Sequence, residues 1–168
     1  MTAVGFYGMS TFEGPVMSIR NVNSLSHYTD WGIGHVHSGA LGWVAFISFG
    51  AMYYLIPVLW NRSAMYSKKL MEWHYWVATL GIVFYITSMW VAGIMEGLMW
   101  RAYDANGFLQ YSFVEAVVAV HPFMIIRLLG GLFFFVGALL MAFNMFMTIR
   151  GPRTAALPLS GAALVAGE

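Results

Sequence analysis

Apolar residues dominate three long stretches of the chain, and short polar segments separate them. The stretches cover residues 32–60, 73–100 and 123–149. Each exceeds the roughly 20 residues that an α-helix needs to cross a bilayer. A fourth apolar segment, residues 1–19, contains Glu13 and Pro15 and starts without a flanking charge, so we interpret it as a helix that lacks its beginning. The pattern predicts an all-α, polytopic transmembrane helical bundle with three full spans and a partial N-terminal one.

Capping and turn residues set the expected helix ends. Thr29 or Asp30 can cap the first full span, and the run 104–107 is typical of a turn in the longer connection. Pro122 is expected to begin the last helix. The tail after Gly151 is small and Ala-rich. The chain therefore divides into a membrane-embedded part, residues 1–150, and a tail, residues 151–168, that is predicted to be disordered.

Basic residues gather in two of the polar segments, one after the first full span and one at the C-terminus. They are Arg62, Lys68, Lys69, Arg150 and Arg153. In the other two connections Arg20 and Arg101 are accompanied by acidic residues. The positive-inside rule places the first group in the cytoplasm, together with the C-terminus.

Composition narrows the class of protein and the available chemistry. Hydrophobic residues make up 60% of the chain and charged residues only 9%, which is typical of a membrane protein and not of a water-soluble domain. The net charge of +1 gives no indication of a nucleic-acid partner. Because the chain has no Cys, it carries no disulfide, thiolate metal site, iron–sulfur cluster or covalently attached haem. Any metal ligand must be His, Met or a carboxylate.

His35 and His37 are the strongest candidates for metal ligands. Residues two apart on an α-helix point about 200° from each other, so the pair suits two separate cofactors better than one shared ion. Neutral imidazole is an axial ligand of haem iron. Small residues surround the pair, and they either leave room for a flat macrocycle or pack against a neighbouring helix. They are Gly34, Ser38, Gly39, Ala40 and Gly42.

Several longer motifs carry a more specific resemblance. They are FYGMSTFEGP at 6–15, SHYTDW at 26–31, GHVHSGALGW at 34–43, GLMWRA at 97–102 and YSFVE at 111–115. These runs resemble the catalytic subunit of cbb3-type cytochrome c oxidases, the C branch of the haem-copper oxygen reductases. The resemblance extends to about Arg150 and covers about the last third of the usual subunit, so it implies part of a twelve-helix fold.

The resemblance implies roles for four residues. His35 would be the axial ligand of the high-spin haem b and His37 an axial ligand of the low-spin haem b. Glu13 would accept a hydrogen bond from His35, since a metal-bound His usually donates its free ring N–H to a carboxylate or carbonyl. Alternatively, Glu13 meets water or an Arg at a helix break near Pro15. Arg101 meets either haem propionates or lipid headgroups.

The implied function is reduction of oxygen to water coupled to proton translocation, in the bacterial inner membrane. The copper ligands would lie outside this chain, and the partners would be the remaining helices of subunit I, c-type cytochrome subunits and lipid. The chain alone would be incomplete and inactive. Two alternatives stay open: a nitric oxide reductase-type subunit, and a non-catalytic membrane protein with a structural His-x-His. We expect His27, His74 and His121 to be interfacial hydrogen-bonding residues, and the role of Glu96 stays open.

Overall fold

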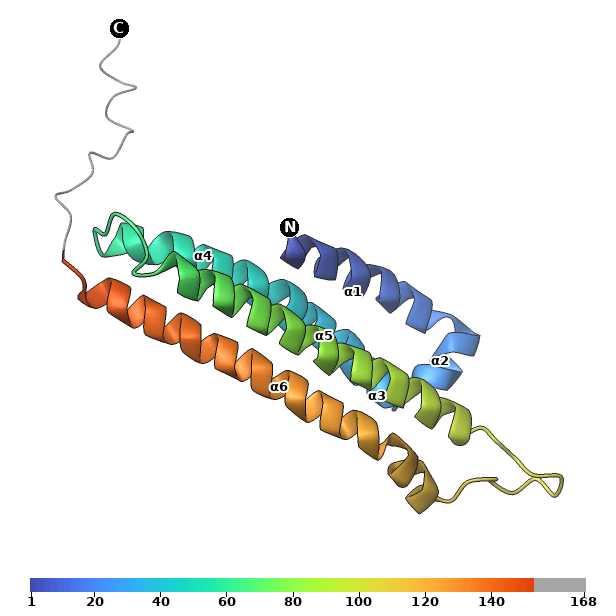
Figure 1. Cartoon of the computed structure of the whole chain (residues 1–168). Coiled ribbons are helices and arrows are strands. Elements are labelled where there is room, and N and C mark those ends of the chain that lie inside the picture. The colour runs from blue at the N-terminus through green and yellow to red at the C-terminus, as the bar shows by residue number, and fades with distance from the viewer. Residues whose placement is uncertain (153–168) are drawn as a thin grey trace, which may run out of the picture.

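The computed structural model describes residues 1–152 as a set of helices and their connections (Figure 1). In chain order these are α1 (Thr2–Ser18), α2 (Arg20–Ser26), α3 (Asp30–His37), the π-helix η1 (Ser38–Val44), α4 (Ala45–Leu59), α5 (Lys68–Met99) and α6 (Phe113–Arg150). The predicted disorder of the tail concerns residues that, from 153 onward, lie outside the described part.

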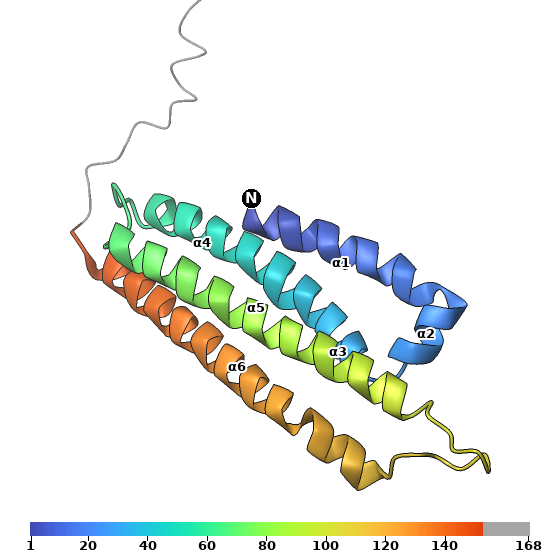
Figure 2. The same cartoon turned by 45° about the vertical axis from the view of Figure 1, so that its right-hand side comes forward.

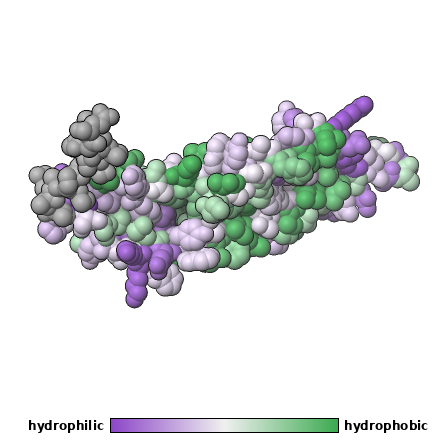
Figure 3. Space-filling view, turned by 90° about the horizontal axis from the view of Figure 1, so that it is seen from above, coloured by the Kyte–Doolittle hydropathy of each residue, from purple (hydrophilic) through white to green (hydrophobic). Residues whose placement is uncertain are grey.

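The helices lie side by side along one direction. The continuous helix formed by α3, η1 and α4 lies next to α1, and its α3 and η1 parts pack on α5. Helix α6 packs along α5 and also contacts α4 (Figures 1 and 2). Among residues 1–152, three helices are long and apolar enough to cross a membrane: Asp30–Leu59, Lys68–Met99 and Phe113–Arg150. Hydrophobic residues occupy much of the middle of the face in Figure 3, and hydrophilic residues gather towards its ends. The predicted all-helical membrane fold is thereby confirmed.

Small residues allow α5 and α6 to approach each other closely. A Cβ atom added to Gly81 would lie 2.6 Å from the Phe134 backbone nitrogen and 2.8 Å from the Gly130 carbonyl oxygen. Farther along the same seam, a Cβ on Gly137 would lie 3.2 Å from the Cβ of Ala78. Lipid tails are as apolar as the side chains, so close backbone packing of this kind is a main source of helix association in membranes.

The start of α6 differs from the prediction. Pro122 lies inside the helix, which begins at Phe113, so its assignment as the first helical residue was wrong. Ser112 caps the helix, and its side chain and that of Glu115 form a reciprocal capping box. This box satisfies backbone N–H groups at the helix start and so extends the helix outward. A proline removes one helical hydrogen bond, but membrane helices tolerate this loss.

The two connections between the long helices are fixed by polar contacts. Arg62 in the α4–α5 connection donates to the carbonyl of Ile149, so this connection and the C-terminal end of α6 lie together. At the opposite end, Asp104 Oδ1 accepts the backbone N–H groups of Asn106 and Phe108, both at 2.9 Å. The predicted turn at 104–107 is therefore confirmed. Gly107 adopts a positive φ of 84°, which glycine accommodates without strain in such a turn.

Candidate functional site

Glu13 and His35 lie in contact, although 22 residues separate them in the sequence. His35 Nδ1 is 3.2 Å from Glu13 Oε2, and the indole N–H of Trp31 donates to Glu13 Oε1 at 2.6 Å. Both partners come from α3, whose N-terminal cap is Thr29, while Glu13 comes from α1. Helix α1 continues through Pro15 to Ser18, so the alternative of a helix break beside Glu13 was wrong. The carboxylate is held at both oxygens.

His37 is held in a different way. Its Nδ1 lies 2.8 Å from the backbone carbonyl of Ile33, one turn earlier in the same helix, and a carbonyl can only accept, so Nδ1 donates. The imidazole ring packs against the ring of Tyr85 on α5, with 5.2 Å between their centroids. His35 therefore has an anionic acceptor and His37 a neutral one. A carboxylate acceptor raises the basicity of an imidazole more than a carbonyl does.

The two imidazoles face different helices, as their spacing predicts. His35 contacts Glu13 on α1 and His37 contacts Tyr85 on α5, and the helix that carries both runs between them (Figure 2). Within residues 1–152, neither Nε2 atom has a hydrogen-bond partner. With Nδ1 occupied on each ring, Nε2 is the atom left to bind another group.

The small residues around the pair are used for helix packing. A Cβ atom on Gly34 would lie 2.9 Å from the Trp90 side chain, and one on Gly42 would lie 2.5 Å from the Phe6 ring. A Cβ atom on Gly39 would lie 3.1 Å from Oγ of Ser10. At these three positions a neighbouring side chain fills the space, so the alternative that these glycines admit a macrocycle was wrong.

A π-helix follows the pair directly. The seven residues Ser38–Val44 form wider turns, and the N–H of Ala45 bonds to the carbonyl of Ala40. The hydroxyl of Ser38 donates to the His35 carbonyl at 2.7 Å. Short π-helical insertions are rare and often lie at functional sites. Sequence reasoning missed this segment, because nothing in its residue pattern distinguishes it from an ordinary helix.

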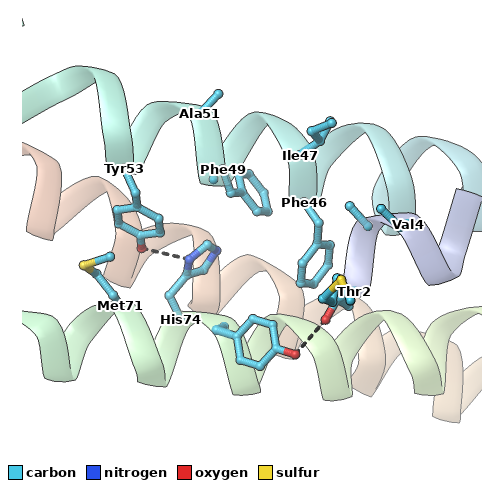
Figure 4. A pocket seen from close by; sticks show the side chains of 13 residues that line it. Thr2, Val4, Phe46, Ile47, Phe49, Ala51, Tyr53, Met71 and His74 are labelled. Carbon is cyan, nitrogen blue, oxygen red and sulfur yellow. Dashed lines mark hydrogen bonds between the residues drawn. The ribbon is translucent and has the colours of Figure 1, made fainter.

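His74, near the start of α5, forms a second polar contact with Tyr53 on α4 (Figure 4). It is buried, with 2% of its surface exposed, and its Nδ1 is 2.8 Å from the Tyr53 hydroxyl. Its Nε2 is buried without a partner among the described residues, beside a cavity of about 700 Å³. His74 thus makes a hydrogen bond, as predicted, and it is buried between helices. His27 and His121 are exposed.

Two arginines, one past the end of α5 and one within α6, are further candidate functional residues. Arg101 is exposed just beyond α5, and no acidic side chain pairs with it among residues 1–152. Sequence reasoning missed Arg127, inside α6, which lies 3.4 Å from both carboxylate oxygens of Asp30. A lone charge in the most apolar span was the signal that could have identified it.

Comparison with known proteins assigns the family. Residues 1–133 match the family described as Cytochrome C and Quinol oxidase polypeptide I. The chain belongs to this family. Three curated relatives of this oxidase subunit show how much of it the chain represents.

The Cytochrome c oxidase subunit 1 homolog of Azorhizobium caulinodans is 66% identical over 168 residues, which cover 100% of this chain and 30% of that protein. The bacteroid homolog of Bradyrhizobium diazoefficiens is 68% identical over 150 residues, or 89% of this chain and 27% of that protein. The Cbb3-type cytochrome c oxidase subunit CcoN1 of Stutzerimonas stutzeri is 55% identical over 155 residues, which cover 92% of this chain and 33% of that protein. The chain thus spans about a third of the length of these relatives.

The oxidase family implies haem and copper, and the described residues fit these two groups unequally. His35 and His37 each offer one free imidazole nitrogen on a separate face, which suits one axial bond to each of two haems. No group of three or more His, Asp or Glu side chains that could hold a metal ion is found within residues 1–152. The described residues therefore fit haem ligation and do not supply a copper site.

Proposed function

We propose that this chain is the part of a cbb3-type cytochrome c oxidase catalytic subunit that supplies axial ligands to two haems. His35 ligates the high-spin haem b through Nε2, and His37 ligates the low-spin haem b through Nε2. The observation that carries the proposal is that both imidazoles have Nδ1 engaged and Nε2 free, on opposite sides of one helix. The 55% identity to a subunit named as cbb3-type supports the oxidase class.

The haem irons supply electron transfer and oxygen binding, and the residues of this chain hold and tune them. Glu13 fixes the plane of the His35 ring and makes that ligand more basic. Trp31 in turn fixes Glu13, so the carboxylate cannot rotate away from the imidazole without losing a second hydrogen bond. Arg101, exposed beyond α5, contacts either a haem propionate or a lipid headgroup.

The whole activity needs more than this chain. We infer that the remaining helices of subunit I supply the copper ligands, and that c-type cytochrome subunits deliver electrons for the reduction of oxygen coupled to proton movement. Helix α1 has no buried residue and α6 exposes many large apolar side chains, which leaves room for further helices and lipid around the described bundle. The chain by itself is not expected to reduce oxygen.

Difference spectroscopy of membranes tests this proposal. The chain is expressed with and without a second chain that supplies the preceding helices, and His35→Ala and His37→Ala are compared with the unchanged sequence. We expect haem signals only when both chains are present. His35→Ala is expected to remove the carbon-monoxide-binding signal and His37→Ala the low-spin signal, because each substitution deletes one axial ligand.

The contrary result is equally specific. If neither substitution changes the reduced-minus-oxidised or carbon-monoxide spectrum, then the pair is structural and the haem-ligand role is refuted for this chain. His121→Ala serves as the matched control, because His121 is an exposed His on another span.

A further inference from the structure

Arg127 places a positive charge inside the bundle, where charged groups are costly and functional by default. Its Nη1 atom is 3.4 Å from both Oδ1 and Oδ2 of Asp30. The Arg127 side chain is 30% exposed and that of Asp30 is 11% exposed, so the pair is shielded from solvent on most sides. The two residues come from α6 and from the first turn of α3, which do not adjoin in the sequence.

Asp30 also joins this pair to α5. Its backbone N–H donates to Glu96 Oε2 at 2.8 Å, at the N-terminal end of the helix that carries the two histidines. A little farther along α5, the backbone of Trp31 packs so closely on Gly93 that no Cβ atom would fit there. The start of α3 is therefore fixed against two helices, by a carboxylate on one and a guanidinium on the other.

The guanidinium also lies close to one histidine. The Arg127 Cζ atom is 5.7 Å from the centre of the Tyr85 ring, within the range of a cation–π interaction. The Tyr85 ring is in turn 5.2 Å from the His37 ring. A single aromatic ring thus separates the positive charge from His37. His35 faces α1 instead, and α1 makes no backbone contact with α6.

We propose that Arg127, Asp30 and Tyr85 form a positioning unit that sets the orientation of His37 and the reduction potential of the haem it ligates. The inference rests on the proposed haem-ligand role of His37. A fixed positive charge stabilises the reduced iron, which carries one positive charge fewer, and a fixed negative charge does the opposite. In the paired state the two charges largely offset each other, and Tyr85 holds the imidazole ring.

Redox titration of both haems in the assembled oxidase tests the proposal, with one variant of each sign. Arg127→Gln removes the positive charge and leaves Asp30 unpaired, so the low-spin potential is expected to fall. Asp30→Asn leaves Arg127 unpaired, so the same potential is expected to rise. Each shift is expected to be on the order of tenfold in the ratio of reduced to oxidised haem, or about 59 mV for one electron. Arg127→Lys restores the charge and is expected to recover most of the value.

A spectroscopic readout separates ring positioning from charge. Tyr85→Leu removes the ring beside His37 and is expected to change the electron paramagnetic resonance g-values of the low-spin haem, which depend on the axial imidazole plane. Tyr85→Phe keeps the ring and is expected to leave these g-values in place. Arg150→Gln is the matched charge control, because Arg150 lies at the far end of α6 over Phe146.

The outcomes distinguish this inference from the proposed function. If His37→Ala removes the low-spin signal but Arg127→Gln and Asp30→Asn leave its potential unchanged, or shift it in the same direction, the positioning unit is refuted and the ligand role stands. Equal shifts of both haem potentials also overturn it, because the effect would then not pass through His37. If His37→Ala leaves the low-spin signal intact, the ligand role itself fails.

Discussion

Glu13 accepts hydrogen bonds at both carboxylate oxygens, from Trp31 and from His35, while His37 donates only to a backbone carbonyl. Two neighbouring imidazoles on one helix thus have acceptors of different charge. If both imidazoles ligate haem iron as proposed, the carboxylate beside His35 and the carbonyl beside His37 support the two ligands differently.

At this scale, if His35 ligates haem iron as proposed, Glu13→Gln is expected to weaken that bond. The amide keeps the shape of the side chain but loses the negative charge, so the imidazole becomes less basic. We expect a lower iron–histidine stretching frequency by resonance Raman spectroscopy and about 10- to 100-fold weaker high-spin haem binding. Glu72→Gln, an exposed glutamate on α5, is the control and is expected to change neither. An unchanged frequency in Glu13→Gln would contradict the role of the carboxylate.

Much of the residue-level prediction depended on one His-x-His pair and the motif around Glu13. Spacing was sufficient to place His35 and His37 on different faces, because helix geometry is regular. Arg127 was missed because its partner, Asp30, lies 97 residues away, a distance that no local pattern spans. The hydrogen-bond partner of His74 was not predicted for a similar reason, since Tyr53 belongs to another helix.

At the scale of elements, the seam between α5 and α6 depends on glycine. We expect Gly81→Ala to destabilise the chain by about 1–3 kcal/mol, because the added methyl group would meet the Phe134 backbone, which cannot rotate away. Gly50→Ala on α4 has no atom within 4 Å of the added group, so the better helix propensity of Ala should make it neutral or slightly stabilising. Denaturation in detergent measures both, and equal effects would argue against close packing at the seam.

The stability of the folded connection between α5 and α6 is expected to depend on pH. The Phe108 backbone N–H, followed by that of Asn106, holds the pKa of the Asp104 carboxyl below its ordinary value of 3.8. Because the pKa of Asp104 is lower in the folded state, its ionised carboxylate stabilises the folded connection fully above pH 3.8. This stabilisation is lost as the pH falls through the folded-state pKa. Hydrogen exchange at the Asn106 and Phe108 amides, corrected for intrinsic rates, should show protection only at pH values above the folded-state pKa of Asp104. Asp104→Ala should lack that protection at every pH.

Hydropathy predicted that the long helices exist, but it did not predict where they begin and end. The last span was expected to begin at Pro122, whereas the capping box of Ser112 and Glu115 starts it at Phe113, nine residues earlier. The S-x-x-E signal was present in the sequence, and the conventional view of proline as a helix start outweighed it. The π-helix had no signal in the residue pattern; it packs mainly against α1.

At the scale of the whole molecule, the two connections define two opposite ends. The absence of native Cys makes single-cysteine labelling a clean test of orientation. We expect Ser63→Cys, in the α4–α5 connection, to react with a membrane-impermeant maleimide only from the cytoplasmic side. Ala105→Cys, in the α5–α6 connection, should react only from the outside, because the basic residues cluster near Ser63. The reverse pattern would contradict the orientation but not the fold.

The π-helix at Ser38–Val44 also makes the chain sensitive to its exact length here. Each wide turn of this segment holds one residue more than an α-helical turn, so deleting one residue would let the segment close to an ordinary helix with His35 still near Glu13 and His37 near Tyr85. An added residue has no narrower turn to take it up and would rotate everything before it by about 100° relative to α4. Both imidazoles would then lose their partners together. A single insertion should therefore be far less tolerated here than a single deletion, and far less than an insertion in the connections at either end.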